Sequence, residues 1–352
     1  MKSKISLASG VCICVSFVTS NYIIYNTNTA LLESDWTCLI LGFILSITLF
    51  AIYSAIMIES QKLTFFELIN GMFSPLFAKI ILASYLGFAL ICAGYCLRAL
   101  MDFCYFFFQG SIPFIILSLV FILLCIYTAE KGVSAIAKFA IIGAIISAGL
   151  IAFSVLLGVK DFDFSYLSLA IPSTSSLTQN SIKTALVPFG ELIILTGVLH
   201  CHQKHSKPLR IFLRGGFIGA LILLITSVRN LLLLGHGGLK TSQFPSYSAL
   251  SVVGIADFLS NLELFALAVY IILCFTKICI CLISAKNAIS KMLNKSSGKK
   301  YVLPLGIAVL ILSFILPKLQ FNSAYLALCF ALSFIIPLFI LFAIKSQKKT
   351  AG

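Results

Sequence analysis

Two ionisable side chains stand in surroundings that are otherwise apolar, and their types make them the best candidates for binding a charged ligand. Glu191 ends the run Leu186-Val187-Pro188-Phe189-Gly190-Glu191, and Lys277 lies deep inside a long apolar stretch. A charge among apolar side chains is strongly unfavourable unless it has a partner of opposite sign. Lys277 therefore needs either a nearby anion or the loss of its proton, and Glu191 is a candidate for a functional site.

The residues before Glu191 predict an interruption of the helix that carries it. Pro188 has no N–H to donate to the helical hydrogen-bond ladder, and Gly190 permits unusual backbone angles. A simple proline kink is the alternative explanation. The carboxylate favours a functional interruption, because a carboxylate at this depth is strongly disfavoured without a function to retain it.

Four further charged residues lie in or beside apolar stretches. Arg98 and Asp102 are four residues apart and so share one helix face, which fits either a mutually neutralising structural pair or a functional one. Arg229 is expected near the outer end of its helix, where a long side chain reaches the membrane surface. Glu263 opens the apolar stretch that contains Lys277. We expect Arg98, Asp102 and Glu263 to act as structural or coupling charges.

The composition identifies the elements that must position these residues. Of the 352 residues, 60% are hydrophobic and 10% are charged, whereas a water-soluble domain carries about 25% charged residues. The chain is therefore predicted to be an all-α integral membrane protein with one transmembrane domain, 1–352, and not a soluble enzyme. We expect about ten spans able to cross a hydrocarbon core of about 30 Å, at 5–25, 35–58, 76–108, 111–128, 133–159, 179–201, 209–235, 262–291, 302–316 and 322–344.

The distribution of basic residues predicts the orientation of these spans. In a soluble protein the net charge of +14 would suggest a nucleic-acid partner, but here the Lys and Arg residues concentrate in alternate loops. Cytoplasmic loops are enriched in basic residues, so both termini are expected in the cytoplasm and the partners are expected to include membrane lipids and no nucleic acid. The loops on the other side contain Lys160, Lys183, Lys240 and Lys318.

The long external loop at 160–180 divides the chain into two halves of five spans, a first repeat at about 1–160 and a second at about 179–345. Because five is odd, the halves must have opposite orientations, which is typical of an inverted-repeat transporter. In such folds the first helix of each half is interrupted, here helices one and six. The signal in span one is weaker, because Ser9-Gly10 and Ser16-Phe17-Val18-Thr19 fit ordinary small-residue packing equally well.

Two connections are predicted to be more than turns. The segment 64–73 has the pattern of a short interfacial helix, and 244–261 has that of an external helix folded over an outer vestibule.

No motif for a metal, a cofactor or catalysis is found. The cysteines fall mostly inside apolar segments and are expected to be small buried hydrophobic residues. His200, His202 and His205 lie in a basic segment, which favours a solvated loop over a metal site. Phosphate-binding glycine loops and nucleophile elbows are missing from the sequence, so no enzymatic activity and no cofactor are expected.

The order and spacing of several short motifs resemble the permease-like B subunits of the nutrient germinant receptors of endospore-forming bacteria, a branch of the amino acid–polyamine–organocation superfamily. The resemblance covers essentially the whole chain. Its motifs are Ile5-Ser6, Leu97-Arg98, Phe189-Gly190-Glu191 followed by a basic loop, Leu234-Gly235, Phe244-Pro245-Ser246, and Asp257-Phe258-Leu259 leading to Glu263 and Lys277.

This resemblance implies a LeuT-type fold, location in the spore inner membrane, and assembly with an A subunit and a lipoprotein C subunit. It also implies a nutrient pocket between spans one, three, six and eight. Carried over by position, the ligand-binding residues are Ser16, Phe17, Cys92, Phe189, Gly190, Glu191 and Lys277.

Three departures from the family pattern bear on that pocket. Many relatives have Gly-x-Gly where this chain has Ser16-Phe17-Val18, which puts backbone recognition of an amino acid's carboxylate in doubt. An arginine that is frequent before span eight is replaced by Asn261. Lys277 falls where sodium-coupled members of the superfamily hold a cation, so its ammonium is expected to hold spans one and eight together in place of sodium.

Three functions fit the sequence. The first is a sensor that binds a small nutrient, expected to be an amino acid, and passes a conformational change to partner subunits. The second is a proton-coupled amino acid permease, and the third is a structural subunit of a release channel without a ligand pocket. A fold alone does not distinguish among them.

Overall fold

The described part of the chain consists of helices joined by short turns and loops. The computed structural model describes residues 6–25, 35–60, 63–167, 174–199, 208–253, 263–295, 298–317 and 323–350, and no strand occurs among them. The main helices are α1 (Leu7–Thr19), α2 (Asp35–Glu59), α3 (Phe65–Met72), α4 (Pro75–Phe107), α5 (Phe114–Lys131), α6 (Val133–Gly158), α7 (Thr174–Thr184), α8 (Pro208–Thr241), α9 (Pro245–Val252), α10 (Glu263–Met292), α11 (Val302–Ile315), α12 (Ser323–Phe330) and α13 (Ile336–Thr350).

Shorter elements complete this architecture. Ala185–Phe189 and Ala331–Ile335 are π-helical, whereas Val159–Asp161, Phe164–Tyr166, Gly190–Gly197 and Lys299–Tyr301 are 3-10 segments. Helical backbone is found at each of the ten predicted spans.

Seven helical segments in the described part of the chain are long and apolar enough to cross a membrane. They are Asp35–Glu59, Pro75–Phe107, Phe114–Lys131, Val133–Asp161, Pro208–Thr241, Leu264–Met292 and Ser323–Ser346. Their outward faces are apolar, with Ile145 67% exposed and Leu156 72% exposed, as expected for helices in contact with lipid. The chain is therefore a multi-pass membrane protein.

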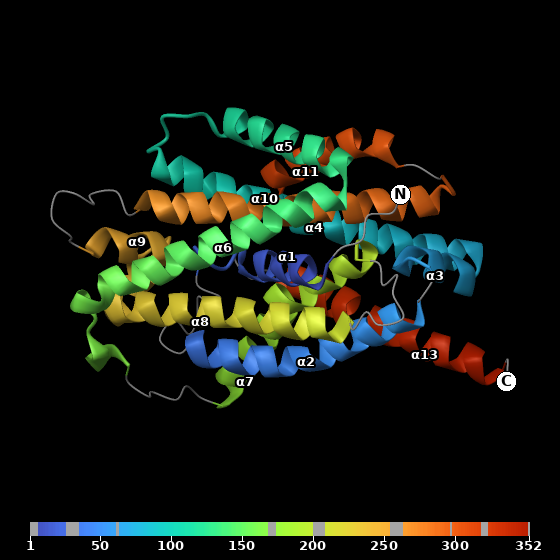
Figure 1. The fold of residues 1–352 in the computed structure, drawn as a ribbon, viewed down its shortest axis with the longest axis horizontal. Coiled ribbons are helices and arrows are strands. Elements are labelled where there is room, and N and C mark those ends of the chain that lie inside the picture. The colour runs from blue at the N-terminus through green and yellow to red at the C-terminus, as the bar shows by residue number, and fades with distance from the viewer. Residues whose placement is uncertain are drawn as a thin grey trace.

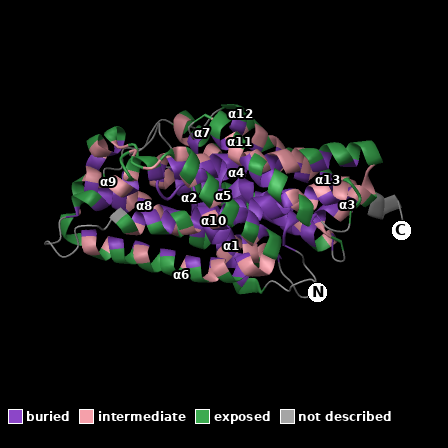
Figure 2. Ribbon diagram, turned by 90° about the horizontal axis from the view of Figure 1, so that it is seen from above, coloured by how far each residue is buried: buried purple, intermediate pink, exposed green. Residues whose placement is uncertain are grey.

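The helices form a bundle around α1. Figure 1 shows α1 in the middle of the molecule, with α10 and α4 on one side and α8 and α2 on the other. Buried residues concentrate along these central helices, and exposed residues follow the outer faces (Figure 2). The most buried of the seven long spans is the one in α10, where 78% of an 18-residue apolar stretch is buried. A charged residue on α10 therefore requires its partners within the protein.

Glycines on α8 let it approach α1 and α2 closely. A β-carbon added at Gly215 would lie 2.3 Å from the β-carbon of Cys14, and one added at Gly219 would lie 2.9 Å from Val18. At Gly216 the added atom would lie 2.7 Å from the ring of Phe50. Small residues at such crossings permit the backbone contact on which helix association in membranes depends.

The predicted interruption before Glu191 takes a different form from the expected unwound segment. The α-helix ends at Thr184 and continues as the π turn and the 3-10 segment that begins at Gly190, with backbone angles in the helical region. Since Pro188 has no N–H and its ring clashes with the carbonyl four residues earlier, a widened turn accommodates it without loss of the helix. In the first half, α1 ends at Thr19 and non-helical turns follow to Tyr25.

The two predicted connecting helices are present. A capping box in which Thr64 and Glu67 bond each other's backbone N–H begins α3, and α9 forms the first half of the predicted external helix. The predicted end of span seven corresponds to a kink in α8, where Gly235 has a φ of 62° and a β-carbon added to it would lie 2.9 Å from the ring of Tyr166. Residues 254–261 lie outside the described part of the chain.

An ion pair ties α3 to the end of α10. Lys291 Nζ donates to Glu67 Oε1 at 2.5 Å, and the Thr64 N–H donates to Glu67 Oε2 at 2.7 Å. Burial raises the pKa of Glu67, but the bonds from Lys291 and Thr64 outweigh burial and lower that pKa to about 2. Because the pKa is lowered on folding, the pair stabilises the fold at neutral pH and loses this effect only as the pH falls from about 4.5 towards 2.

Because α8 approaches α1 closely at Gly215, adding one methyl group there is expected to lower the stability of the protein. Gly215→Ala should destabilise the protein by about 1–3 kcal/mol, because the added atom overlaps Cys14 in packed surroundings. Gly237→Ala is the matched control on the same helix, since nothing lies within 4 Å of its added β-carbon. The measurement is the unfolding temperature of the purified protein in detergent, and equal temperatures for the two variants would contradict the packing described here.

Candidate functional site

A buried ion pair joins α10 to the 3-10 segment Gly190–Gly197. Lys277, halfway along α10, places its Nζ 2.5 Å from Oε2 of Glu191, at the start of the 3-10 segment. The Lys277 side chain is 0% exposed and that of Glu191 is 1% exposed. Each charge satisfies the requirement that the other creates, since either one alone in this interior would be strongly destabilising.

Tyrosine hydroxyls surround the other oxygen of Glu191. The Tyr325 hydroxyl, on α12, donates a short hydrogen bond to Oε1, and the Tyr22 hydroxyl, in the turns after α1, lies 3.5 Å from the same atom. The Sγ of Cys92 on α4 is 3.2 Å from the Tyr325 hydroxyl. Glu191 thus joins residues from the turns after α1 and from α4, α10 and α12 in one polar cluster inside an apolar interior.

Aromatic rings lie close to the ammonium of Lys277. Its Nζ is 4.9 Å from the ring centroid of Phe17 and 5.7 Å from that of Tyr22. Ring faces attract cations, and the attraction grows when water is excluded. Lys277 therefore contacts α1 and the turns that follow it through ring faces, while its anionic partner lies on the 3-10 segment Gly190–Gly197.

One tyrosine joins the two distorted helices. The Tyr53 hydroxyl, on α2, lies 3.1 Å from the carbonyl oxygen of Gly190 and 2.8 Å from that of Ser333. Both carbonyls belong to segments where the α-helical ladder is replaced, so they need another donor. Ser333 also lies against Gly190, where an added β-carbon would be 2.9 Å from its Oγ.

The residues predicted to bind a ligand divide into two groups. Phe17, Cys92, Glu191 and Lys277 meet in the cluster. Ser16 is buried on α1 with its Oγ lacking a hydrogen-bond partner in the described structure. The ring of Phe189 packs instead against the rings of Phe43 and Phe50, with centroid distances of 5.8 and 6.3 Å. Gly190 contributes its carbonyl to Tyr53 and lies against Ser333.

The other predicted charges lie outside the cluster. Arg98 Nε and Asp102 Oδ2 form a 3.0 Å ion pair, and the Arg98 guanidinium lies over the ring of Phe114. This geometry agrees with the structural alternative for the pair. The expectation that Arg229 reaches the membrane surface is wrong: it is 4% exposed, because neighbouring elements enclose it. The side chain of Glu263 lies outside the described part of the chain.

The tyrosines of the cluster were not predicted from the sequence. Tyr22, Tyr53 and Tyr325 stand singly in apolar segments, and a tyrosine there is ordinarily read as an amphipathic side chain near an interface. The one available signal is that a buried hydroxyl needs a partner, which a buried carboxylate supplies.

This cluster resembles a charge-neutral binding centre more than a catalytic one. A carboxylate and an ammonium that neutralise each other could also bind a zwitterion, the carboxylate pairing with its ammonium and the ammonium with its carboxylate. With both side chains buried, a ligand reaches them only when the surrounding helices move apart.

Two spore germination proteins of Bacillus subtilis (strain 168) are similar to the chain. Spore germination protein KB is 23% identical over 368 residues, which cover 99% of this chain and 97% of that protein. The putative spore germination protein YfkT is 23% identical over 337 residues, covering 90% of this chain and 88% of that protein.

Two solved transporters have a similar fold. A Na⁺-coupled sialic acid symporter in a substrate-bound outward-open state has a TM-score of 0.73 and 13% identity, and the match covers 96% of this chain and 78% of the symporter. Mhp1, a nucleobase-cation-symport-1 family transporter in a closed conformation with bromovinylhydantoin bound, has a TM-score of 0.71 and 11% identity over 95% of this chain and 76% of Mhp1. The shared feature is the LeuT-like transporter fold.

A family model described as spore germination protein matches residues 3–322. This match spans the helices that form the Glu191–Lys277 pair and most of the bundle around them. The chain therefore belongs to the spore germination protein family.

Proposed function

We propose that this chain is the nutrient-sensing, permease-like subunit of a spore germinant receptor. The observation that carries the proposal is a buried Glu191–Lys277 pair at the centre of a transporter-like fold, in a chain from a germination family. In this proposal the protein lies in the spore inner membrane, binds a small nutrient of the amino-acid class, and signals through A and C subunits.

The proposed binding residues are those around the pair, together with Ser16 and the segment from Phe189 to Glu191. The ammonium of an amino acid would take the place of Lys277 beside Glu191, and its carboxylate would take the place of Glu191 beside Lys277. Three features support this arrangement: the unpartnered Oγ of Ser16, the rings of Phe17 and Tyr22 beside the cation, and the carbonyl-rich turn at Gly190. The rearrangement of the pair is the proposed signal.

A proton-coupled amino acid permease is the second candidate, and the likeness to two symporter structures favours it. The two functions differ in whether the ligand crosses the membrane. Uptake of a labelled amino acid into vesicles that contain this chain alone, driven by a pH gradient, would support the permease. Nutrient-dependent germination without such uptake would support the sensor.

The finer topology is also part of the proposal. We place ten spans in two inverted repeats, at about 1–160 and 179–345, with both termini in the cytoplasm. In support, α1 and the segment 174–197 are the first elements of their halves, and each departs from a continuous α-helix near its middle or end. In Figure 1, the beginning of the central helix α1 faces the side of the molecule where α3 lies and where α13 ends.

The charge pair predicts the outcome of a double substitution. Lys277→Met should abolish the nutrient response and lower the protein level, because removing one partner of a buried pair costs about 3–5 kcal/mol. Lys277→Met combined with Glu191→Gln removes both charges and should restore the level. Nutrient-triggered germination should still be slower by about tenfold or more, the scale on which a charge-assisted contact acts.

Protein levels of these two variants are measured by immunoblots of spore membranes. Germination is measured as the loss of spore refractility after addition of single amino acids. Lys160→Met, on an exposed lysine, is the control for loss of a positive charge. If the double variant germinates normally at a normal level, the pair is structural and the proposed pocket is wrong.

Gly190 gives a second functional prediction. Gly190→Ala should impair the nutrient response by about tenfold while the protein stays in the membrane, because the methyl group displaces Ser333 and disturbs both distorted helices. Adding Ser333→Gly should restore the response by making room. Gly87→Ala is the matched control, since open space surrounds that added β-carbon. Failure of Ser333→Gly to rescue would argue against this contact.

The topology is testable by cysteine labelling in a background from which reactive cysteines are removed. A cysteine introduced at Ser297 should react with a membrane-impermeant reagent only after the membrane is permeabilised, because the surrounding basic segment is expected in the cytoplasm. A cysteine at Lys240 should react from outside. Reversed labelling of these two sites would contradict the proposed orientation.

A further inference from the structure

One buried cation in this protein has no anionic partner among the described residues. The Nη1 of Arg229 donates to Ser154 Oγ at 2.6 Å, and Nε and Nη2 donate to Asn230 Oδ1 at 3.3 and 2.8 Å. These acceptors are neutral, and a guanidinium has more N–H donors than these bonds use. Within the described structure, its charge and some of its donors are left uncompensated.

This arrangement differs from the way the fold treats its other interior cations. Lys277 is completely buried and pairs with Glu191, and Arg98, at 22% exposure, pairs with Asp102. Arg229 is 4% exposed and bonds only neutral groups. A buried charge without a partner is strongly destabilising, so an anion from outside the protein would stabilise the site.

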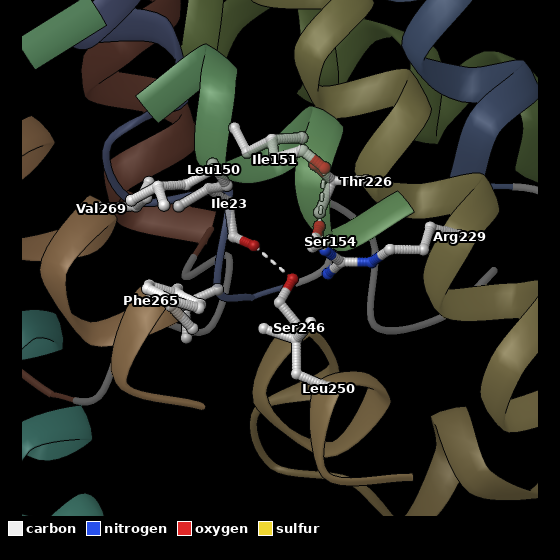
Figure 3. A pocket seen from close by; sticks show the side chains of 12 residues that line it. Ile23, Leu150, Ile151, Ser154, Thr226, Arg229, Ser246, Leu250, Phe265 and Val269 are labelled. Carbon is white, nitrogen blue, oxygen red and sulfur yellow. Dashed lines mark hydrogen bonds between the residues drawn. The ribbon is translucent and has the colours of Figure 1, made fainter. Parts of the chain in front are cut away.

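A small cavity of about 30 Å³ lies beside the guanidinium. It is formed where the turns after α1, the second half of α6, and α8, α9 and α10 meet, and Figure 3 shows Arg229, Ser154, Thr226 and Ser246 around it. The remaining walls are apolar, and an apolar wall strengthens the attraction between a cation and an anion. The apolar walls come from Ile23, Ile24, Leu150, Ile151, Leu250, Phe265, Ala266 and Val269.

The hydroxyl groups of the cavity have already committed their protons. Ser154 donates to the carbonyl of Ile151, Thr226 donates to Ile222, and Ser246 donates to Ile23. Of the polar side chains that line this cavity, Arg229 alone has donors left over. The site therefore offers positive charge and N–H groups, a combination that suits an anion and disfavours a cation.

We infer that this cavity is a binding site for a small monovalent anion, either a halide or the carboxylate group of a small organic acid. The volume suits one such ion or group, and spare N–H groups of Arg229 would bind it. The site is separate from the Glu191–Lys277 cluster, so the inference does not depend on the proposed function. The cavity and the cluster nevertheless share one chain segment, because Ser246 of the cavity donates to the carbonyl of Ile23, and the preceding residue, Tyr22, belongs to the cluster.

The test is equilibrium binding of radiolabelled chloride to the full-length protein in lipid nanodiscs, with sodium isethionate holding the ionic strength constant. The wild-type protein should bind chloride saturably, with displacement by unlabelled chloride or acetate. Arg229→Met should weaken binding by about tenfold or more, because charge-assisted hydrogen bonds are lost. Arg214→Met is the matched control, an exposed arginine on the same helix whose loss should leave the affinity unchanged.

Leu250→Phe is a second variant in case Arg229→Met does not accumulate. It keeps the guanidinium and fills the cavity with a larger side chain, so it should also weaken binding. Displacement by acetate at lower concentrations than chloride would identify a carboxylate as the better ligand, and the reverse order would identify a halide. Lack of saturable binding to the wild type, or unchanged affinity in both Arg229→Met and Leu250→Phe, would overturn the inference.

Discussion

The central constraint on this structure is that a charge inside an apolar bundle needs a partner. Glu191 and Lys277 meet that constraint for each other, and their contact holds the middle of α10 against the distorted helix that contains Pro188. The tyrosines and the thiol that complete the cluster then find acceptors or donors inside an otherwise apolar interior. Removing the pair would leave several elements with unsatisfied polar groups, so the arrangement of the centre depends on it.

The two helix distortions have a common physical basis. Pro188 lies within the first π turn, Ala185–Phe189, and Pro337 follows the second, Ala331–Ile335, so each widened turn accommodates a proline that prevents a regular ladder. Each distortion frees carbonyl groups that Tyr53 lies close enough to serve. Segments far apart in the sequence are thereby joined through a hydroxyl, which makes their movements interdependent.

Much of this architecture could be predicted from the sequence, because hydropathy and helix-capping patterns are local. The short helices predicted at 64–73 and 244–261 correspond to α3 and α9, and the predicted end of a span at Gly235 corresponds to the kink in α8. Glu191 and Lys277 were likewise selected from the sequence as candidate residues. The identity of Lys277's partner did not, since it depends on how helices distant in the sequence pack. The same holds for Tyr325, and for Arg229, whose burial depends on the four other elements that surround it and not on its own helix.

Helix α10 carries a lysine in each of two ion pairs, Lys277 halfway along it and Lys291 in its last turn. With a rise of about 1.5 Å per residue, these positions are about 21 Å apart along a single rod. A rod held at both points transmits a twist or a shift from one to the other with little loss. Any shift of Lys277 along this rod would therefore also move Lys291 and, through it, Glu67 on α3.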